Sequence, residues 1–291
     1  MIVDVHAHCW PRPDCFSPSF QADASRMRLS PVNLVTRYED YKNATGPDEV
    51  VSLVFGGKAR LTGVWIHDDE VVSYVAQDPD RMLGFMSLDP TQPGWQEEMH
   101  EGRERLGLVG IKLLPMYAGF HPQDEALDPL WRYAAKHGLP VLLHTGTTFV
   151  SKAPIECTLP RHLDAVAIRH PDVKMILAHL GHPYEGETVA VIRKHPNLFA
   201  DVSALFYRPW QLFHSLMLVH EYNVWDKILF GTDFPVTTVA ETVAGLRALC
   251  DVKIDRFQLP REEIERLIHR DALGLLGLTH PRLASRKGGL S

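Results

Sequence analysis

Three observations predict an α/β fold, a closed (β/α)8 TIM barrel. Short apolar segments recur along the 291-residue chain, with helical patterns between them. From the second segment onward, their starts lie 24 to 34 residues apart, which suits a repeated strand–turn–helix–turn unit. The segments are nearly continuous in Val, Ile and Leu, as in parallel strands that are covered on both faces. Eight such units make a barrel. The expected strands cover residues 2–6, 50–55, 82–88, 109–114, 140–144, 174–179, 198–202 and 228–231.

Segments between these strands have the apolar spacing and the end signals of helices. A glycine at position 138 suits the end of one helix, and Pro260 precedes the start of the last one. The clearest expected helices cover residues 126–137, 161–170, 238–249 and 261–276. The first interval is longer and is rich in Pro, Ser, Asp and Arg. The composition of residues 9–43 therefore predicts a long loop. It would lie at the carboxyl-terminal face of the barrel, where active sites are built.

Length and composition predict one soluble domain. Hydrophobic residues make up 45% of the chain and charged residues 23%, which is ordinary for a globular enzyme. We expect a single domain over residues 1–281 and a polar tail over residues 282–291. The four cysteines are too scattered for a disulfide framework and suit free thiols in a reducing compartment. The N-terminus lacks the basic region of a signal peptide, so we expect a cytoplasmic protein.

The charge balance argues for a small-molecule partner. The formal net charge is −6, and no long basic run is present. Nucleic acids and anionic membranes attract proteins through clustered Lys and Arg, so neither partner is expected. No apolar segment approaches the ~20 residues that span a bilayer.

Polar residues that favour divalent metals stand at the ends of predicted strands. His6 and His8 end the first strand and, being two apart, point the same way. His144 ends the fifth strand, His179 the sixth and Asp233 the eighth. Because the carboxyl ends of barrel strands meet at one face, we expect these five side chains to surround one point. Imidazole and carboxylate ligands suit zinc, and a catalytic site keeps one position open for water.

Five motifs at these positions together resemble the amidohydrolase superfamily. The resemblance is closer to its amidohydrolase 2 group, which includes aminocarboxymuconate semialdehyde decarboxylase, resorcylate decarboxylases and related hydrolases. The motifs are DVHAH, GIKLLP, LLHTG, ILAHLG and FGTDFP, and the resemblance extends from residue 2 to about residue 278. It implies a barrel of the metal-dependent hydrolase type with one divalent ion. Zinc is the first expectation for this ion and manganese the alternative.

The resemblance also assigns roles. It implies that His6, His8, His144 and Asp233 bind the metal and that His179 is the general acid and base. Asp233 would also accept a hydrogen bond from the metal-bound water, which gives it a second, catalytic role. These roles are chemically consistent, because a metal lowers the pKa of its water toward ~7 and a neutral histidine can then take the proton.

Other residues near the strand ends are candidates for substrate binding. Lys112 corresponds to a lysine that is carboxylated in two-metal relatives; we expect an ordinary lysine here that contacts a substrate carboxylate. Arg12 and Arg208 follow the first and seventh strands and are candidates to clamp a carboxylate. Trp10 is a candidate for the wall of an apolar pocket. His182 stands where relatives often have Gly. It either lines the pocket or has an exposed or capping position.

The resemblance leaves two reactions open. Thr and Gly follow His144, whereas the histidine of the decarboxylases tends to precede Pro, so we expect hydrolysis. A metal-bound hydroxide would attack a small organic acid, amide or lactone. The alternative is non-oxidative decarboxylation of an aromatic or unsaturated acid by a carboxy-lyase. Members of the group are often dimers, and a homodimer is expected by that analogy alone.

Two further classes are less consistent with the sequence. Metal-dependent deoxyribonucleases on this barrel share the first-strand histidines and the last aspartate. They carry a glutamate at mid-chain, where this chain has Lys112, and they need a basic rim that a net charge of −6 does not favour. A binding protein on a degenerate barrel would have lost a ligand or His179, and all are present.

Overall fold

The computed structural model describes residues 1–26, 33–46 and 49–280. Its centre is a barrel of eight parallel strands, one of which is interrupted and has two labels. The strands are β1 (Ile2–His8), β2 (Val50–Phe55), β5 (Met82–Gly84) with its continuation β6 (Met86–Leu88), β7 (Ile111–Leu113), β8 (Val141–Leu143), β9 (Met175–Leu177), β10 (Leu198–Asp201) and β11 (Ile228–Leu229). The predicted fold class is confirmed.

Backbone hydrogen bonds close the ring at two places. At the interruption, Phe85 N–H donates to the carbonyl of Val54 on one side (2.8 Å), while the next residue pairs with the neighbouring strand on the other side. Between the last and first strands, Val5 N–H donates to Phe230 O (3.0 Å), and Asp233 N–H donates to His6 O (2.7 Å). The second bond ties the two strand ends that carry the predicted metal ligands.

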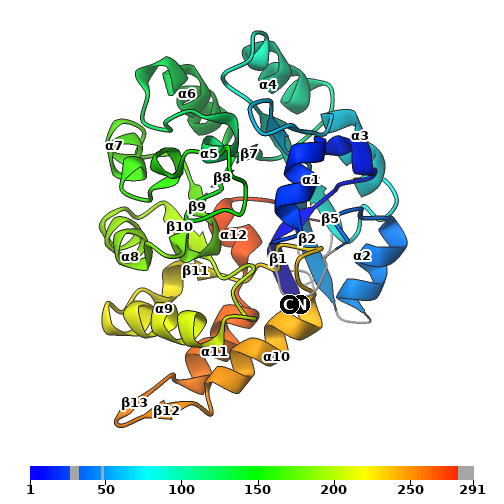
Figure 1. Cartoon of the computed structure of the whole chain (residues 1–291). Coiled ribbons are helices and arrows are strands. Elements are labelled where there is room, and N and C mark those ends of the chain that lie inside the picture. The colour runs from blue at the N-terminus through cyan, green and yellow to red at the C-terminus, as the bar shows by residue number, and fades with distance from the viewer. Residues whose placement is uncertain (27–32, 47–48, 281–291) are drawn as a thin grey trace, which may run out of the picture.

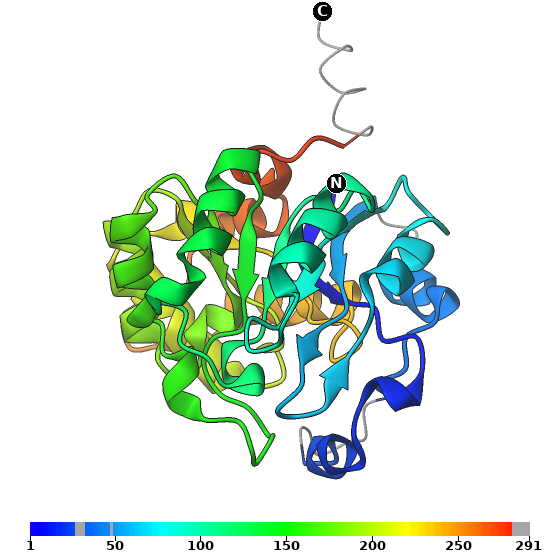
Figure 2. The same ribbon diagram turned by 90° about the horizontal axis from the view of Figure 1, so that it is seen from above.

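Helices surround the strands in chain order (Figure 1). The ring consists of α2 (Tyr38–Thr45), α3 (Asp68–Val75), α4 (Trp95–Glu104), α6 (Asp128–His137), α7 (His162–Arg169), α8 (Glu185–Lys194), α9 (Pro209–Glu221) and α10 (Val239–Leu249). Two shorter helices, α11 (Arg261–Ile268) and α12 (Ala272–Leu276), follow. A helix that precedes the ring, α1 (Pro18–Ala24), lies at the opposite end of the molecule from the N-terminus (Figure 2).

Short elements complete the described chain. They are α5 (Pro115–Ala118), the 3-10 helices η1 (Pro13–Cys15), η2 (Glu125–Leu127), η3 (Ile155–Thr158), η4 (Ala178–Gly181) and η5 (Trp225–Lys227), and two hairpins made of β3 (Lys58–Ala59) with β4 (Val64–Trp65) and of β12 (Lys253–Ile254) with β13 (Phe257–Gln258). Over the described residues, no helix has the length and apolar character needed to cross a membrane.

The structure departs from the predicted elements at three places. The expected loop over residues 9–43 contains α1 and the start of α2, and the expected helix over residues 261–276 is two helices. The expected helix is divided at Asp271, because the carboxylate of Asp271 accepts a hydrogen bond from Gly274 N–H (2.9 Å) and caps the start of α12. The sixth strand ends early, so His179 lies in η4. The expected tail over residues 282–291 lies outside the described residues.

Buried apolar side chains give the site a rigid base. One cluster joins residues from β1, β2, β8, β9, β10 and β11 with residues of α12. A second and larger cluster packs the helices against the strands. The pairing of β1 with β2 shifts register between Asp4 and Ala7. Such irregularities re-aim side chains, and here the shift lies beside the two predicted ligands of β1.

Candidate active site

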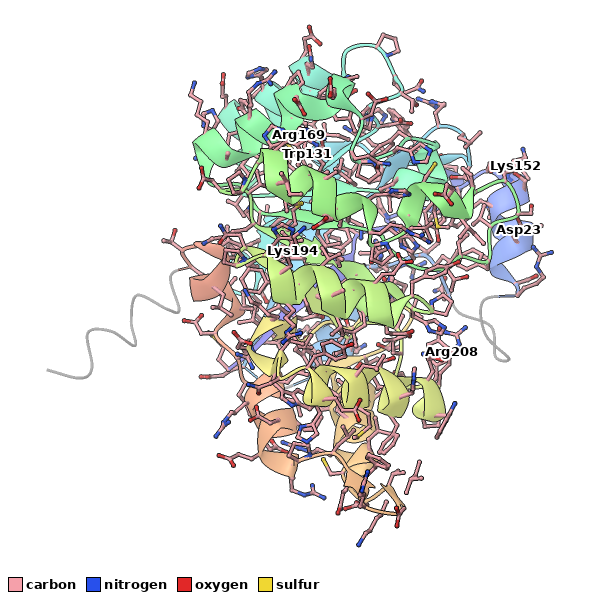
Figure 3. All side chains as sticks on the ribbon, turned by 90° about the vertical axis from the view of Figure 1, so that its left-hand side faces the viewer. Asp23, Trp131, Lys152, Arg169, Lys194 and Arg208 are labelled. Carbon is pink, nitrogen blue, oxygen red and sulfur yellow. The ribbon has the colours of Figure 1, made fainter. Side chains whose placement is uncertain are left out.

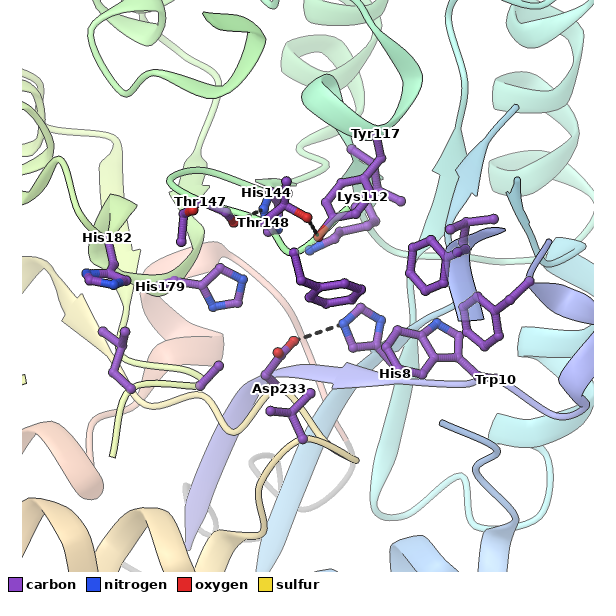
Figure 4. A pocket seen from close by; sticks show the side chains of 18 of the residues that line it. His8, Trp10, Lys112, Tyr117, His144, Thr147, Thr148, His179, His182 and Asp233 are labelled. Atoms are coloured by element: carbon purple, nitrogen blue, oxygen red, sulfur yellow. Dashed lines mark hydrogen bonds and ion pairs between the residues drawn. The ribbon is translucent and has the colours of Figure 1, made fainter. Parts of the chain in front are cut away.

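A cavity of about 480 Å³ opens at the carboxyl ends of the strands. Four of the five predicted strand-end residues, His8, His144, His179 and Asp233, line it (Figure 4). Much of its wall is aromatic, from Trp10, Phe16, Phe20, Tyr117 and Phe149. A polar floor beneath an apolar wall is the usual composition of a site for a small organic molecule.

The floor brings together two histidines and one aspartate. His6 Nε2 and His8 Nε2 each lie 3.0 Å from Asp233 Oδ1. Ligand atoms of His6, His179 and Asp233 also lie within 4.8 Å of one another. The structure thus places four of the five strand-end residues around one point.

Backbone geometry sets two of these side chains. Asp233 has φ of 64° and His179 has φ of 58°, both in the left-handed region that non-glycine residues adopt uncommonly. Asp233 is fixed there by its own N–H, which donates to His6 O (2.7 Å). His179 N–H donates to Asp201 Oδ1 (2.9 Å). Residues held in sparsely populated backbone regions cluster at functional sites, which fits this position.

Asp201 and Ser203 orient the histidines, and the sequence analysis missed both. Asp201 Oδ2 lies 2.9 Å from His6 Nδ1, and the side chain of Asp201 is fully buried. Ser203 Oγ lies 2.8 Å from His179 Nδ1 and 3.1 Å from His6 Nδ1. With their Nδ1 atoms occupied, His6 and His179 direct Nε2 toward the centre of the site. The signal was the polar spacing Asp-Val-Ser at the end of the seventh strand, since residues two apart share a face.

The protonation equilibria suit a cation at this point. Burial raises the pKa of Asp233, but the charge of His6 and hydrogen bonds from His6 and His8 outweigh this effect. The pKa of Asp233 therefore lies well below the usual value. Burial lowers the pKa of His8 and of His179 to about 4. Neutral imidazoles and an ionised carboxylate are the forms in which these groups bind a metal.

The donor set fits a divalent ion. Burial and Lys112 lower the pKa of His6, but Asp201 and Asp233 outweigh them and raise it above the ordinary value. A metal would therefore displace the proton from Nε2 of this ring, while Asp201 accepts the hydrogen on Nδ1. Two ligands bound to zinc at ~2.05 Å in a tetrahedron lie about 3.3 Å apart. The imidazole–carboxylate distances of 3.0 Å are close to that separation. Each of these two pairs could therefore share an ion through Asp233, whereas the three residues whose ligand atoms all lie within 4.8 Å of one another are His6, His179 and Asp233.

His144 does not converge with them. Its Nε2 lies 3.1 Å from the carbonyl of Thr147, although its ring centroid is 5.1 Å from that of His179. The next two residues are explained by packing. Thr145 Oγ1 donates to Ala178 O (2.6 Å), and Gly146 lies against the backbone of the loop after β9. Neither Thr145 nor Gly146 lines the cavity, so these two residues connect two loops, and only His144 of the motif borders the cavity.

Lys112 lies inside the cluster. It is 1% exposed, and its Nζ lies 3.3 Å from His6 Nε2 and 4.5 Å from the ring centroid of Phe55. Burial lowers the pKa of Lys112 to about 7, although Asp233 and Asp201 act in the opposite direction. A neutral amine is compatible with a cation close by, whereas an ammonium group would repel it.

The remaining predicted residues lie farther out. Trp10 lines the cavity and stacks on the ring of His8 at 4.1 Å. Arg208, labelled in Figure 3, also lines it and forms its exposed rim, with Nη1 2.9 Å from the hydroxyl of Tyr207. Arg12 does not line the cavity. Its guanidinium binds both carboxylate oxygens of Glu70, at 2.9 and 3.1 Å.

A loop and a short helix close one side of the mouth. Asp23 of α1 accepts hydrogen bonds from the backbone N–H and the hydroxyl of Ser151, both at 2.8 Å. Figure 3 shows Asp23 beside the loop that carries Lys152. Phe20 of α1 and Phe149 of the loop meet edge to face at 5.5 Å and form part of the aromatic wall.

The barrel and its site belong to a family of metal-dependent enzymes. The family model of the amidohydrolases, Amidohydro_2, matches residues 3–278, and the chain is a member of this family. The family resemblance seen in the sequence is confirmed. Its members include both hydrolases and decarboxylases. The protein is therefore an enzyme, but membership of the family does not decide which of the two reactions it catalyses. No curated protein matches the chain.

Solved structures share the fold at low sequence identity. An uncharacterized TIM-barrel protein from Bordetella bronchiseptica is 20% identical with a TM-score of 0.73, covering 95% of this chain and 98% of that one. The probable 2-pyrone-4,6-dicarboxylic acid hydrolase of Acinetobacter baumannii is 14% identical with a TM-score of 0.64, covering 95% and 99%. A manganese-bound 5-carboxyvanillate decarboxylase of Novosphingobium aromaticivorans is 16% identical with a TM-score of 0.64, covering 96% and 97%.

Proposed function

We propose that the protein is a metal-dependent hydrolase that uses one divalent ion, zinc or manganese, to cleave a small organic acid, amide or lactone. The observation that carries the proposal is the approach of His6 Nε2 and His8 Nε2 to Asp233 Oδ1 beneath a largely apolar cavity. His6, His8 and Asp233 would hold the ion. His144 would join them if its ring released the carbonyl of Thr147.

Each residue then has a distinct task. When bound, the ion would lower the pKa of a coordinated water and polarise the substrate carbonyl. His179 is neutral at pH 7, and Ser203 occupies its Nδ1, so its Nε2 would take the proton from the attacking water. Trp10 and the neighbouring aromatic side chains would hold the apolar part of the substrate. Arg208 would bind a carboxylate at the rim, where its guanidinium faces no acidic side chain in the described part of the chain.

Decarboxylation is the second candidate. Arg208 at the rim favours it, because a carboxy-lyase must hold an acid in a fixed orientation. The similar structures include a 5-carboxyvanillate decarboxylase as well as a dicarboxylic acid hydrolase, so this comparison supports both reactions.

A deoxyribonuclease is less consistent with the sequence, since Lys112 replaces the expected glutamate. The net charge of −6 supports a small-molecule substrate and no nucleic-acid partner. The four free cysteines support a cytoplasmic enzyme. The homodimer expected from the family is part of the same proposal.

The test is turnover of a panel of lactones, amides and aromatic carboxylic acids by protein loaded with zinc or with manganese. Water labelled with 18O reports hydrolysis through label in the product acid, and evolved CO2 reports decarboxylation. We expect labelled product without CO2. His179→Asn should keep the metal and lose at least a hundredfold in kcat, while His100→Asn, at an exposed histidine of α4, should match the wild type.

The outcomes separate the candidates. Release of CO2 without incorporation of label would establish the carboxy-lyase. Full activity of His179→Asn would contradict the assigned proton transfer. Failure of both metal-loaded forms on the whole panel would contradict both reactions.

A further inference from the structure

A second histidine–carboxylate pair borders the cavity, apart from the metal-binding cluster. Glu185, at the start of α8, is 3% exposed. Its Oε1 lies 2.9 Å from His182 Nδ1, 2.5 Å from Gln211 Nε2 and 3.1 Å from Ser215 Oγ. A carboxylate is costly to bury unless hydrogen bonds compensate for its lost hydration, and three polar groups surround this one.

The pair fixes which nitrogen of His182 faces the cavity. Burial raises the pKa of Glu185, but hydrogen bonds from His182 and from the backbone outweigh that effect, so the group is ionised. An ionised carboxylate only accepts hydrogen bonds, so His182 Nδ1 must carry the hydrogen. In a neutral imidazole the lone pair is then on Nε2. His182 lines the cavity, and no described residue forms a hydrogen bond with this Nε2.

The backbone of His182 is held as firmly as its side chain. Its carbonyl accepts a hydrogen bond from Thr147 N–H (2.7 Å), and its own N–H donates to His179 O (2.9 Å). A Cβ at position 146 would lie 2.1 Å from this carbonyl oxygen, so Gly146 is required for the approach of the two loops. Figure 4 shows His182 on the same wall of the cavity as His179. An acceptor atom in a fixed position at a cavity wall suits recognition of a bound molecule.

We propose that His182 is a substrate-binding residue whose Nε2 accepts a hydrogen bond from a hydroxyl or N–H group of the substrate. Glu185 is a positioning residue that acts through His182. The proposal rests on the proposed function, because it treats this cavity as the substrate site. It narrows the substrate to an acid, amide or lactone that carries a hydrogen-bond donor, since a molecule without one would leave Nε2 buried and unpaired.

The first test needs no substrate. A long-range ¹H–¹⁵N spectrum of the uniformly labelled protein distinguishes the two neutral tautomers of each histidine, and His182→Asn assigns the signals. We expect the hydrogen on Nδ1 in the wild type. In Glu185→Gln we expect a larger share of the form with the hydrogen on Nε2. A wild-type His182 with its hydrogen on Nε2 alone would overturn the proposal, whether or not the variants fold.

The second test measures binding of two probes of similar size, 3-hydroxybenzoate and 3-methylbenzoate, to the zinc-loaded protein by calorimetry. One buried hydrogen bond of about 0.5–1.5 kcal/mol corresponds to a roughly two- to tenfold preference for the hydroxyl compound. We expect that preference in the wild type and a ratio near one in His182→Ala. Arg208→Gln is the matched control, because it should weaken both probes equally.

An unchanged ratio in His182→Ala, or no binding of either probe by the wild type, would count against the proposal. Turnover of the substrate panel tests the proposed function separately. An active hydrolase whose His182→Ala variant keeps the wild-type preference would refute the role of His182 alone.

Discussion

Lys112 provides a quantitative test of the buried site in metal-free protein. Burial lowers its pKa from 10.5 to about 7, whereas the unfolded chain keeps the ordinary value. Between pH 7 and 10.5 the unfolded state therefore binds more protons than the folded state, and the free energy of unfolding rises with pH. At 1.36 kcal/mol per pKa unit, the contribution of this lysine between pH 7 and 8.5 is about 1.6 kcal/mol. Below pH 7 the lysine is charged in both states and contributes no slope.

The assay is urea unfolding of chelator-treated protein at pH 7.0 and 8.5. We expect the wild type to gain about 1.6 kcal/mol more than Lys112→Met over this interval. Contributions from thiols and other groups are common to both proteins and cancel in the difference. Lys136→Met, at an exposed lysine of α6, should behave as the wild type does. An equal rise in Lys112→Met would refute the reasoning, and so would a carboxylated lysine, because it would not titrate in this range.

Three further predictions concern the residues that shape the site. Asp201→Asn should lower zinc affinity by about 10–100-fold in competition with a chelator, because Asp201 holds a ligating imidazole in place; unchanged affinity would show that the bond has no such role. Gly146→Ala should destabilise the protein by at least about 1–3 kcal/mol in thermal unfolding, given φ of +90° and a Cβ 2.1 Å from the carbonyl of His182; a wild-type Tm would contradict the packing. In metal-free protein, His8 and His179 have pKa values of about 4 in the folded state and 6.5 in the unfolded state. Between pH 4 and 6.5 the unfolded state therefore binds more protons than the folded state. The free energy of unfolding should fall as the pH falls from 6.5 to 4. Each should contribute up to about 3.4 kcal/mol, and the loss should be smaller in His179→Asn.

The sequence predicted the site best at the strand ends, where histidine and aspartate side chains have metal binding or proton transfer as their typical use. His6, His8, His179 and Asp233 could be assigned to one site because parallel strands in a barrel share a carboxyl end. His144 was assigned by the same argument, but its ring turns toward the carbonyl of Thr147, which a strand pattern cannot reveal. Three of the four expected helices were predicted to within two residues, because their apolar spacing and end signals agree.

The sequence could not predict the contacts between residues of different loops. Arg12 looked like a rim residue until the fold brought Glu70, 58 positions away, within 2.9 Å of it. Asp201 was overlooked because an aspartate at a strand end is as often a cap as an orienting group. The pairing of His182 with Glu185 is local, but its direction into the cavity depends on Gly146 and the loop after β8. Such contacts depend on tertiary structure and leave weak local signals.

The central claim is a single metal held by His6, His8 and Asp233. Elemental analysis of protein purified without chelator or added metal tests it most directly, with Asp233→Ala as the paired variant. We expect about one zinc or manganese per wild-type chain and almost none in Asp233→Ala. Two ions per chain would indicate a carboxylated Lys112 and a two-metal centre. No bound metal, with none taken up on reconstitution, would contradict the claim.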